Sequence, residues 1–558
     1  GVVVSGVAEE FDIFRFVANH ALPGHSPNRR ALGVVRHKLG NRDAGLVDDA
    51  LLHGPRDQRV GEALGAGAGR QAQGFQHIAG VADIRVRFTA AGVESLRLDL
   101  VGKTADSKET GMTVSSITLD GSALPFTHEE DVLLIELPAP STGSDELDFR
   151  IAYAGSPATG FEIGDNKHGD RTFFSDNWPD KARHWLPTVD HISDKATSEF
   201  LITAPARYQV VSNGLLKEES DLGEGLRLTH WKQSLPTAPW LYMLGAAEFA
   251  VQHVDTFDDK AIQTWVYRQD RDAGFYDFAV PTREALQYFS DFVGPFVYEK
   301  LANIQSNSVG GGMEAASAIL YGDDSVTGER TERWRYVIVH ELAHQWFGNS
   351  VTEATWDDVW LSEGFATYFS YLFYEHTDGR DVFIDNMRQM RDRIFEFHEE
   401  NPDYRIVHDN LDDMGEVTTR QTYDKGAWTL HMLREKIGDE AWWKGIRSYY
   451  ATYMNGHANT DDFRSEMEAA CECDLRPFFD QWLYQGGNLF LQGEWRYDQQ
   501  ADTLEVTVIQ PRNDDSGYTT EIEIGIYADD ESLPDIHTLS LSGERSKISI
   551  PAANKPAD

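Results

Sequence analysis

The period of the hydrophobic pattern changes twice along the chain, and this change constrains the fold more strongly than any other feature of the sequence. Apolar and polar residues alternate from Ile84 to about residue 250, as at Leu96, Leu98 and Leu100. A helical period begins near residue 280, and alternation returns after Gly486. Because alternation is typical of half-buried strands and a period of 3.6 of helices, the pattern predicts β, then helical, then β regions.

This order predicts a multidomain α+β protein, and 558 residues are too many for one ordinary domain. We expect an N-terminal β saddle or sandwich domain over residues 84–250, an α/β domain over 251–490 and a short C-terminal β-sandwich piece over 491–558. No large C-terminal helical domain is expected. The clearest predicted helices cover residues 331–347, 363–375 and 424–437.

Residues 1–83 differ from the rest in composition. The first 80 residues hold 9 basic and 8 acidic residues and 13 glycines, with little sustained alternation. We interpret this Gly/Ala/Arg-rich segment as either a disordered extension or a mistranslated upstream stretch. The first thirty residues lack the basic start and apolar stretch of a secretory signal, and no apolar run is long enough to span a membrane. The compartment stays open, with cytoplasmic and exported locations both compatible.

The charge balance is strongly acidic. Asp and Glu number 91 against 50 Lys and Arg, for a net charge of −41, and only 15 of the basic residues are Lys. Such a surface repels phosphate backbones and anionic membranes, which argues against nucleic-acid partners. It also suits a salt-rich medium, where ions screen the self-repulsion, and we favour a halophilic protein over an ordinary acidic one.

Only two cysteines occur, Cys471 and Cys473. Two cysteines exclude a disulfide scaffold, and we interpret the pair as ordinary buried thiols and not as a second metal site.

The stretch 337–349 holds two histidines four residues apart. On a helix, His340 and His344 lie on one face, so both imidazoles can reach one metal ion. Glu341, beside the first ligand, can accept a proton from an activated water. Glu363, 19 residues after His344, supplies the third ligand and leaves a fourth position for water. Two His and one Glu form the ligand set of thermolysin-type zinc peptidases, so we expect one Zn²⁺ per chain.

From about residue 84 to 490 the chain resembles the aminopeptidase N family of gluzincins, which also includes the leukotriene hydrolase branch. That family carries a Gly-x-Met-Glu-Asn signature, and Gly311, Gly312, Met313 and Glu314 match its first four positions, with Ala315 at the fifth. The resemblance implies that Glu314 holds the free α-amine of a peptide. The three glycines from 310 to 312 would let the peptide backbone approach as an added strand.

The resemblance also covers a Tyr that precedes Lys-Gly by two residues, here Tyr423. In the family this tyrosine donates a hydrogen bond to the oxyanion, a second catalytic role beside that of Glu341. The N-terminal domain of the family offers a polar pair near the substrate amine, and Asp176 and Trp178 occupy those positions here.

The resemblance implies a thermolysin-like catalytic domain and a zinc aminopeptidase that uses zinc-activated water and a Glu base on peptides with a free N-terminus. A catalytically inactive binding scaffold is disfavoured, because Glu341, Tyr423 and the ligand residues are all present. Two catalytic alternatives stay open. A thermolysin-type endopeptidase keeps the zinc site without needing Glu314, and an epoxide hydrolase side activity, as in the leukotriene branch, uses the same constellation. The preferred first residue and the oligomeric state are not predicted.

Overall fold

The computed structural model describes residues 12–19 (backbone only), 77–104, 110–407, 411, 414–511, 517–527, 534–552 and 555. These residues form two compact units. The first holds the described residues up to Arg391 together with Val407–Leu475, and the second holds Asp392–Ile406 with the described residues from Arg476 onward. Among the described helices, none is long and apolar enough to cross a membrane.

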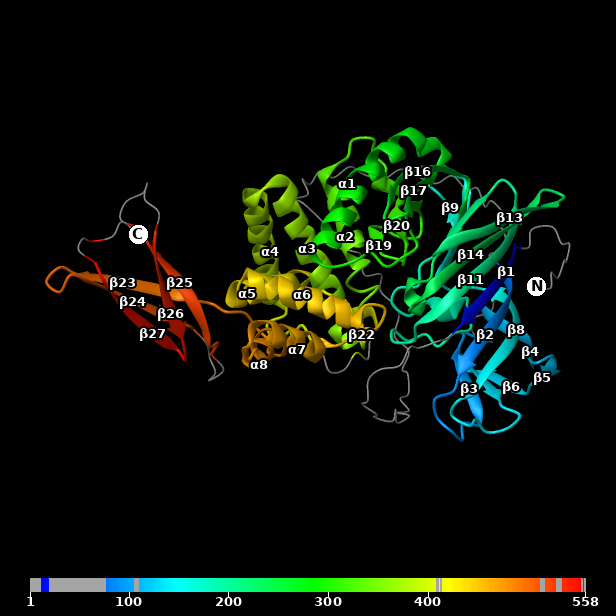
Figure 1. Ribbon diagram of the computed structural model, residues 1–558, viewed down its shortest axis with the longest axis horizontal. Helices are drawn as coiled ribbons and strands as arrows, with labels where there is room; N and C mark the ends of the chain where they lie inside the picture. The colour runs from blue at the N-terminus through cyan, green and yellow to red at the C-terminus, as the bar shows by residue number, and fades with distance from the viewer. Residues whose placement is uncertain are drawn as a thin grey trace, which may run out of the picture. The chain divides into compact units, whose positions relative to one another are not determined.

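The first unit opens with a sheet of eight strands (Figure 1). Alternation in sequence becomes alternation in burial, because in β2 the residues Ile78, Ala82 and Ile84 face the core. The strands, in spatial order, are β13 (Leu215–Gly223), β14 (Leu226–Thr237), β11 (Ala196–Pro205), β1 (Asp12–Asn19), β2 (Ile78–Arg87), β8 (Glu146–Ser156), β4 (Gly111–Leu119) and β5 (Ser122–Ala123).

Strand β1 comes from the segment 1–83 that the composition set apart. It pairs antiparallel with β11 and parallel with β2, and β2 itself begins at Ile78. The β domain therefore extends into this segment, while residues 20–76 lie outside the described part of the chain.

Two smaller sheets complete the β domain. The four-stranded sheet runs β12 (Gln209–Ser212), β15 (Leu244–Ala247), β10 (Arg171–Ser175), β9 (Phe161–Asp165). The three-stranded sheet runs β3 (Ser95–Asp99), β7 (Val132–Glu136), β6 (Phe126–Glu129).

The α/β domain is built on a five-stranded mixed sheet. Its strands are β16 (Phe249–Phe257), β17 (Lys260–Tyr267), β18 (Lys300–Ser306), β20 (Ala318–Gly322) and β19 (Gly312–Met313). Strands β17, β18 and β20 are parallel, whereas β19 pairs antiparallel with β20 and lies at the sheet edge. Figure 1 shows α1 and α2 beside this sheet.

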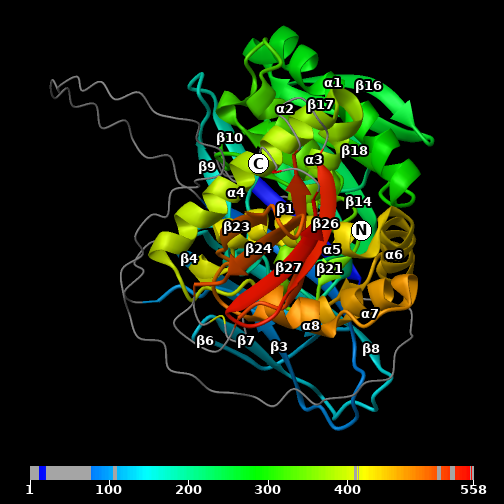
Figure 2. The same ribbon diagram turned by 90° about the vertical axis from the view of Figure 1, so that its left-hand side faces the viewer.

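The longer helices of the structure include the three predicted over residues 331–347, 363–375 and 424–437. They are α1 (Arg271–Phe292), α2 (Glu332–His344), α3 (Trp360–Asp378), α4 (Arg380–Glu400), α5 (Gly426–Ile437), α6 (Asp439–Tyr453) and α7 (Thr460–Cys471). Helix α5 ends because Gly438 adopts φ of 79°, which ordinary residues avoid. Helix α7 begins with a capping box between Asn459 and Asp462. Helices α6 and α7 pack side by side (Figure 1, Figure 2).

Short elements connect these helices and strands. Strand β21 (Thr352–Glu353) pairs parallel with β22 (His457–Ala458) and so joins the segment after α2 to the segment after α6. The short helices are η1 (Ala182–His184), η2 (Pro239–Leu241), η3 (Arg268–Asp270), η4 (Asp323–Ser325), η5 (Trp356–Asp358), η6 (Met414–Glu416) and the π-type η7 (Gln421–Lys425).

The second unit contains the predicted C-terminal β piece. After α8 (Arg476–Phe479) and η8 (Asp480–Tyr484) come β23 (Gln492–Asp498), β24 (Thr503–Ile509), β25 (Thr520–Ile526), β26 (Asp535–Leu541) and β27 (Arg545–Pro551). Strands β23, β24 and β27 form one sheet and β25 with β26 another, around a core of Leu504, Val506, Val508, Leu539, Leu541 and Ile550. Past η8 the described residues form strands and loops, as the pattern predicted.

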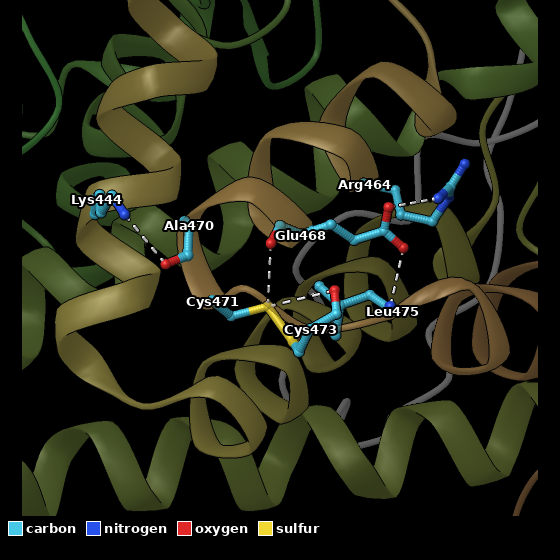
Figure 3. Close-up of a disulfide and its surroundings, with 7 residues drawn as sticks. All are labelled: Lys444, Arg464, Glu468, Ala470, Cys471, Cys473 and Leu475. Carbon is cyan, nitrogen blue, oxygen red and sulfur yellow. Dashed lines mark hydrogen bonds and ion pairs between the residues drawn. A yellow bond between two sulfur atoms is a disulfide. The ribbon is translucent and has the colours of Figure 1, made fainter.

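The two cysteines are bonded to each other, so the expectation of buried thiols is wrong (Figure 3). Their Cα atoms lie 5.3 Å apart at the end of α7, where Glu472 between them adopts φ of 55° and turns the chain back. The local turn, which two-residue spacing alone does not reveal, brings the two sulfur atoms together.

Candidate metal centre

Helix α2 and helix α3 bring three metal-ligand side chains together. The Nε2 atoms of His340 and His344 lie 3.0 Å apart, and Glu363 Oε2 lies 3.3 Å from the first and 3.2 Å from the second. All three residues are buried, and their ligand atoms lie within 4.8 Å of one another. Because α3 is buried over its first four turns, Glu363 is held against α2. Two imidazole nitrogens and one carboxylate oxygen are a donor set that suits zinc.

The second ring nitrogen of His344, Nδ1, is also in contact with polar groups. Its Nδ1 lies 3.1 Å from the carbonyl oxygen of Phe347 and 3.0 Å from the hydroxyl of Ser362. Gly348 permits this packing, because its φ is 107° and a Cβ there would collide with the Ser362 hydroxyl. Such contacts fix the ring orientation of a metal-binding histidine.

Glu341 lies beside the ligands and is almost completely buried. Its carboxylate packs against Gly312, where a Cβ would overlap it. Burial, reinforced by the nearby Glu314 carboxylate, raises the pKa of Glu341 well above its ordinary range. A bound divalent cation opposes that rise, so a metal at this centre favours the ionised form.

Glu314 immediately follows β19. It is 5% exposed, and its Oε1 accepts no hydrogen bond from any described residue. Nδ1 of His344 lies 3.9 Å from this oxygen. Burial raises the pKa of Glu314 to about 7, against the opposing pull of His344, and Asp176 contributes to the rise. A buried carboxylate oxygen that accepts no hydrogen bond from the described residues is suited to receive a cationic ligand group.

Tyr423 reaches the centre from the π-type turn η7. Its hydroxyl donates to Oε1 of Glu363 at 2.8 Å, and its ring lies 6.0 Å from the ring of His340. Burial and the Glu363 carboxylate raise the pKa of Tyr423 well above its ordinary value, so the hydroxyl keeps its proton and remains a donor.

The glycines before Glu314 form the sheet edge beside the centre. Gly312 and Met313 make up β19, and the carbonyl of Gly311 accepts a hydrogen bond from Gly322 N at 2.9 Å. A Cβ built on Gly311 meets no atom within 4 Å. Met313 is buried, whereas the glycines leave room for another backbone to approach.

The N-terminal domain contributes an aromatic cluster near Asp176. Trp178 packs edge to face against Trp240, with ring centroids 5.0 Å apart, and against Trp356 of η5, with centroids 4.8 Å apart. The resemblance implies a polar residue at position 178, but the side chain of Trp178 packs against other aromatic rings.

Three residues that contact the centre were missed by the sequence analysis. Ser362 supports His344, and the side-chain amides of Gln345 and Asn349 donate to the carbonyl oxygen of Glu314. Ser362 and Gln345 are sequence neighbours of ligands, which is the signal that could have found them. The contact of Asn349 depends on the turn after α2, which sequence spacing does not show.

Comparisons with known proteins agree with this fold. Residues 278–482 match the Peptidase family M1 domain, and residues 75–241 match the Peptidase M1 N-terminal domain. The three residues that could hold a metal ion, His340, His344 and Glu363, all lie within the match to the Peptidase family M1 domain. The chain belongs to peptidase family M1.

Among curated proteins, glutamyl aminopeptidase of Bos taurus is 28% identical over 390 residues, which are 66% of this chain and 40% of that protein. Probable aminopeptidase 1 of Saccharolobus solfataricus is 24% identical over 422 residues, 71% of this chain and 51% of that protein. The chain thus spans about half or less of the length of these relatives.

Among solved structures, the M1 zinc metallopeptidase from Deinococcus radiodurans is similar in fold. It has a TM-score of 0.62 and 23% identity, and the match covers 74% of this chain and 91% of that one. A mutant of that protein was solved with a Tyr-Ser-Ala substrate.

Proposed function

We propose that this protein is a zinc aminopeptidase that hydrolyses the N-terminal peptide bond of peptides with a free N-terminus. The observation that carries the proposal is the unpartnered, buried Oε1 of Glu314 beside the three ligand residues. A carboxylate at that place can pair with the α-ammonium of a substrate and so restrict cleavage to the first peptide bond.

The residues of the centre fit zinc. His340, His344 and Glu363 converge, the outer nitrogen of His344 has two supporting contacts, and we propose one ion per chain at this set. Zinc, when bound, supplies a Lewis acid that polarises a carbonyl and lets water attack near neutral pH.

Within this proposal each remaining side chain has one role. Glu341 accepts the proton of the attacking water and returns it to the leaving amine. Tyr423, protonated and within reach of the ligands, donates to the oxyanion that develops on the scissile carbonyl. The open space beside Gly311 lets the peptide backbone approach the sheet edge as an added strand, while Gly312 leaves room for the Glu341 carboxylate and Met313 next to it is buried.

A panel of aminoacyl chromogenic amides tests the proposal. Each amide is offered with a free and with an acetylated amine, before and after a chelator, and the panel includes glutamyl because relatives are named glutamyl aminopeptidase. We expect cleavage of the free-amine forms only and loss of activity with the chelator. Equal cleavage of acetylated amides favours the endopeptidase alternative.

Salt adaptation belongs to the same proposal. With 91 acidic and 50 basic residues, the folded chain carries carboxylates that repel one another, and dissolved ions screen this repulsion. We therefore propose a protein that is more stable in molar salt.

A further inference from the structure

The carbonyl of Glu314 is held by the segment that follows helix α2 and not by its own sheet. Strand β19 ends at Met313, so the ladder with β20 stops one residue before Glu314. The Glu314 oxygen instead accepts a hydrogen bond from Gln345 Nε2 at 2.9 Å and one from Asn349 Nδ2 at 2.6 Å. Two donors fill the two lone pairs of a carbonyl oxygen, which fixes the backbone of this residue in position and orientation.

Both donors are tied directly to the ligand His344. Gln345 is the next residue along the chain, and its Oε1 also accepts the backbone N–H of Ser317, so it holds the segment of Glu314 at two points. Asn349 donates its own backbone N–H to the carbonyl of His344 at 3.0 Å. The distance between Glu314 and the metal ligands therefore depends on the side chains of Gln345 and Asn349.

Among the residues that the structure describes, the Asn349 side chain makes one hydrogen bond. Its Nδ2 donates to Glu314, whereas its Oδ1 has no hydrogen-bond partner among the described residues, although the residue is 1% exposed. Burial of an amide that uses one of its four hydrogen-bond positions is costly, so we attribute this side chain to the one bond that it makes to Glu314.

Lys195 of the N-terminal β domain binds the turn that follows α2 and contains Asn349. Lys195 is buried, and its Nζ donates to the carbonyl oxygens of Asn349 at 3.2 Å, Ser350 at 2.9 Å and Gly456 at 2.7 Å. The Lys195 side chain thus donates to two backbone oxygens of the turn after α2 and to one of the segment before β22. These bonds restrict the movement of Asn349.

We propose that Asn349 and Gln345 are positioning residues that set the distance between Glu314 and the metal ligands, and so make the protein remove one residue at a time. This inference rests on the proposed aminopeptidase function. The α-nitrogen of a peptide lies roughly 2.5 Å from the carbonyl carbon of the same residue, whereas one further residue adds roughly 3.5 Å. Selection of the first bond therefore requires that the amine-binding carboxylate be fixed to within about 1 Å.

The test compares Asn349→Ala and Gln345→Met, which keeps the side-chain length, with Ser350→Ala as the matched control. Ser350 is as buried as Asn349, and its hydroxyl accepts Asn455 N at 3.2 Å, away from Glu314. Zinc content and melting temperature are measured for all, with kcat and KM for leucine p-nitroanilide. Binding of leucinamide and of N-acetyl-leucinamide is measured by calorimetry in a Glu341→Gln background.

For Asn349→Ala and Gln345→Met we expect full zinc content and kcat/KM lower by about 10- to 100-fold, because a misplacement near 1 Å has effects of this size. Leucinamide binding should weaken about tenfold while N-acetyl-leucinamide binding is unchanged, and Ser350→Ala should match the parent.

The inference is overturned if both variants behave like Ser350→Ala, or if both lose zinc or fail to fold while Ser350→Ala does not. The proposed function fails separately, and earlier, if the parent protein binds and cleaves acetylated substrates as well as free ones.

Discussion

The hydroxyl of Tyr423 donates to Oε1 of Glu363 at 2.8 Å, while Oε2 of the same carboxylate lies 3.2 Å from Nε2 of His344. One hydrogen bond thus joins the proposed oxyanion donor to a proposed metal ligand. This contact holds the tyrosine at the centre before substrate arrives, so its hydroxyl needs only a small movement to reach a developing oxyanion.

Replacement of Tyr423 by Phe should show whether Tyr423 acts as the oxyanion donor or as a support of the ligand Glu363. Loss of the hydroxyl removes the oxyanion donor, so kcat should fall by about 100- to 1,000-fold while KM changes little. Zinc content, measured by mass spectrometry of the metal, should stay at the parent level. Loss of zinc in parallel with activity would instead make Tyr423 a support of Glu363.

Replacement of Glu341 by Gln keeps the side-chain shape and removes the base. Zinc should remain bound, and turnover should fall by about 100-fold or more, because the amide cannot accept the proton of water. Metal analysis beside steady-state kinetics checks this. Retained turnover would show that another group accepts the proton.

The helices and the placing of His340 beside His344 could be predicted from the sequence because both depend on local spacing, whereas Glu363 lies on a different helix. The predicted segments 331–347 and 363–375 correspond to α2 and α3, and a spacing of four placed His340 and His344 on one helical face. A spacing pattern identifies only the helix or strand in which its residues lie.

Other features depend on partners that are distant in sequence or on the path of a turn. Strand β1 pairs with β11, whose residues lie almost two hundred positions further along the chain, so composition gave no sign of it. The bond between Asn349 and Glu314 joins residues 35 apart through the turn that follows α2. The Cys471–Cys473 bond depends on the left-handed conformation of Glu472.

His431 provides a prediction about pH. Burial among aromatic rings, with Arg380 and Arg434 nearby, lowers its pKa from 6.5 to about 4. Between these values the unfolded chain binds more protons than the folded chain, so stability should fall as the pH falls from about 6.5 to about 4. The expected loss is on the order of 3 kcal/mol of unfolding free energy.

Urea titrations across this pH range check the prediction. His431→Phe should flatten the acid limb, whereas His253→Phe, at an exposed position, should leave it as steep as in the parent. Equal steepness in all three proteins would show that His431 does not titrate as expected.

The charge balance provides a prediction about salt. Raising KCl from about 0.1 M to about 1 M shortens the screening length from about 10 Å to about 3 Å and relieves repulsion among the carboxylates. The melting temperature should therefore rise, and sorbitol at matched osmolality should not reproduce the rise in full. A melting temperature that stays level or falls with KCl would refute salt adaptation and leave the metal centre unaffected.

The central claim is that zinc and the Glu314 carboxylate together remove single residues from free N-termini. Mass spectrometry of an octapeptide of non-repeating sequence and its N-acetylated twin tests it most directly, with parent protein, chelated protein, zinc-restored protein and Glu314→Ala. We predict stepwise loss of single N-terminal residues from the free peptide only, abolished by chelation, restored by zinc, and reduced in Glu314→Ala with its zinc retained. Internal cuts, or equal digestion of the acetylated twin, would contradict the account.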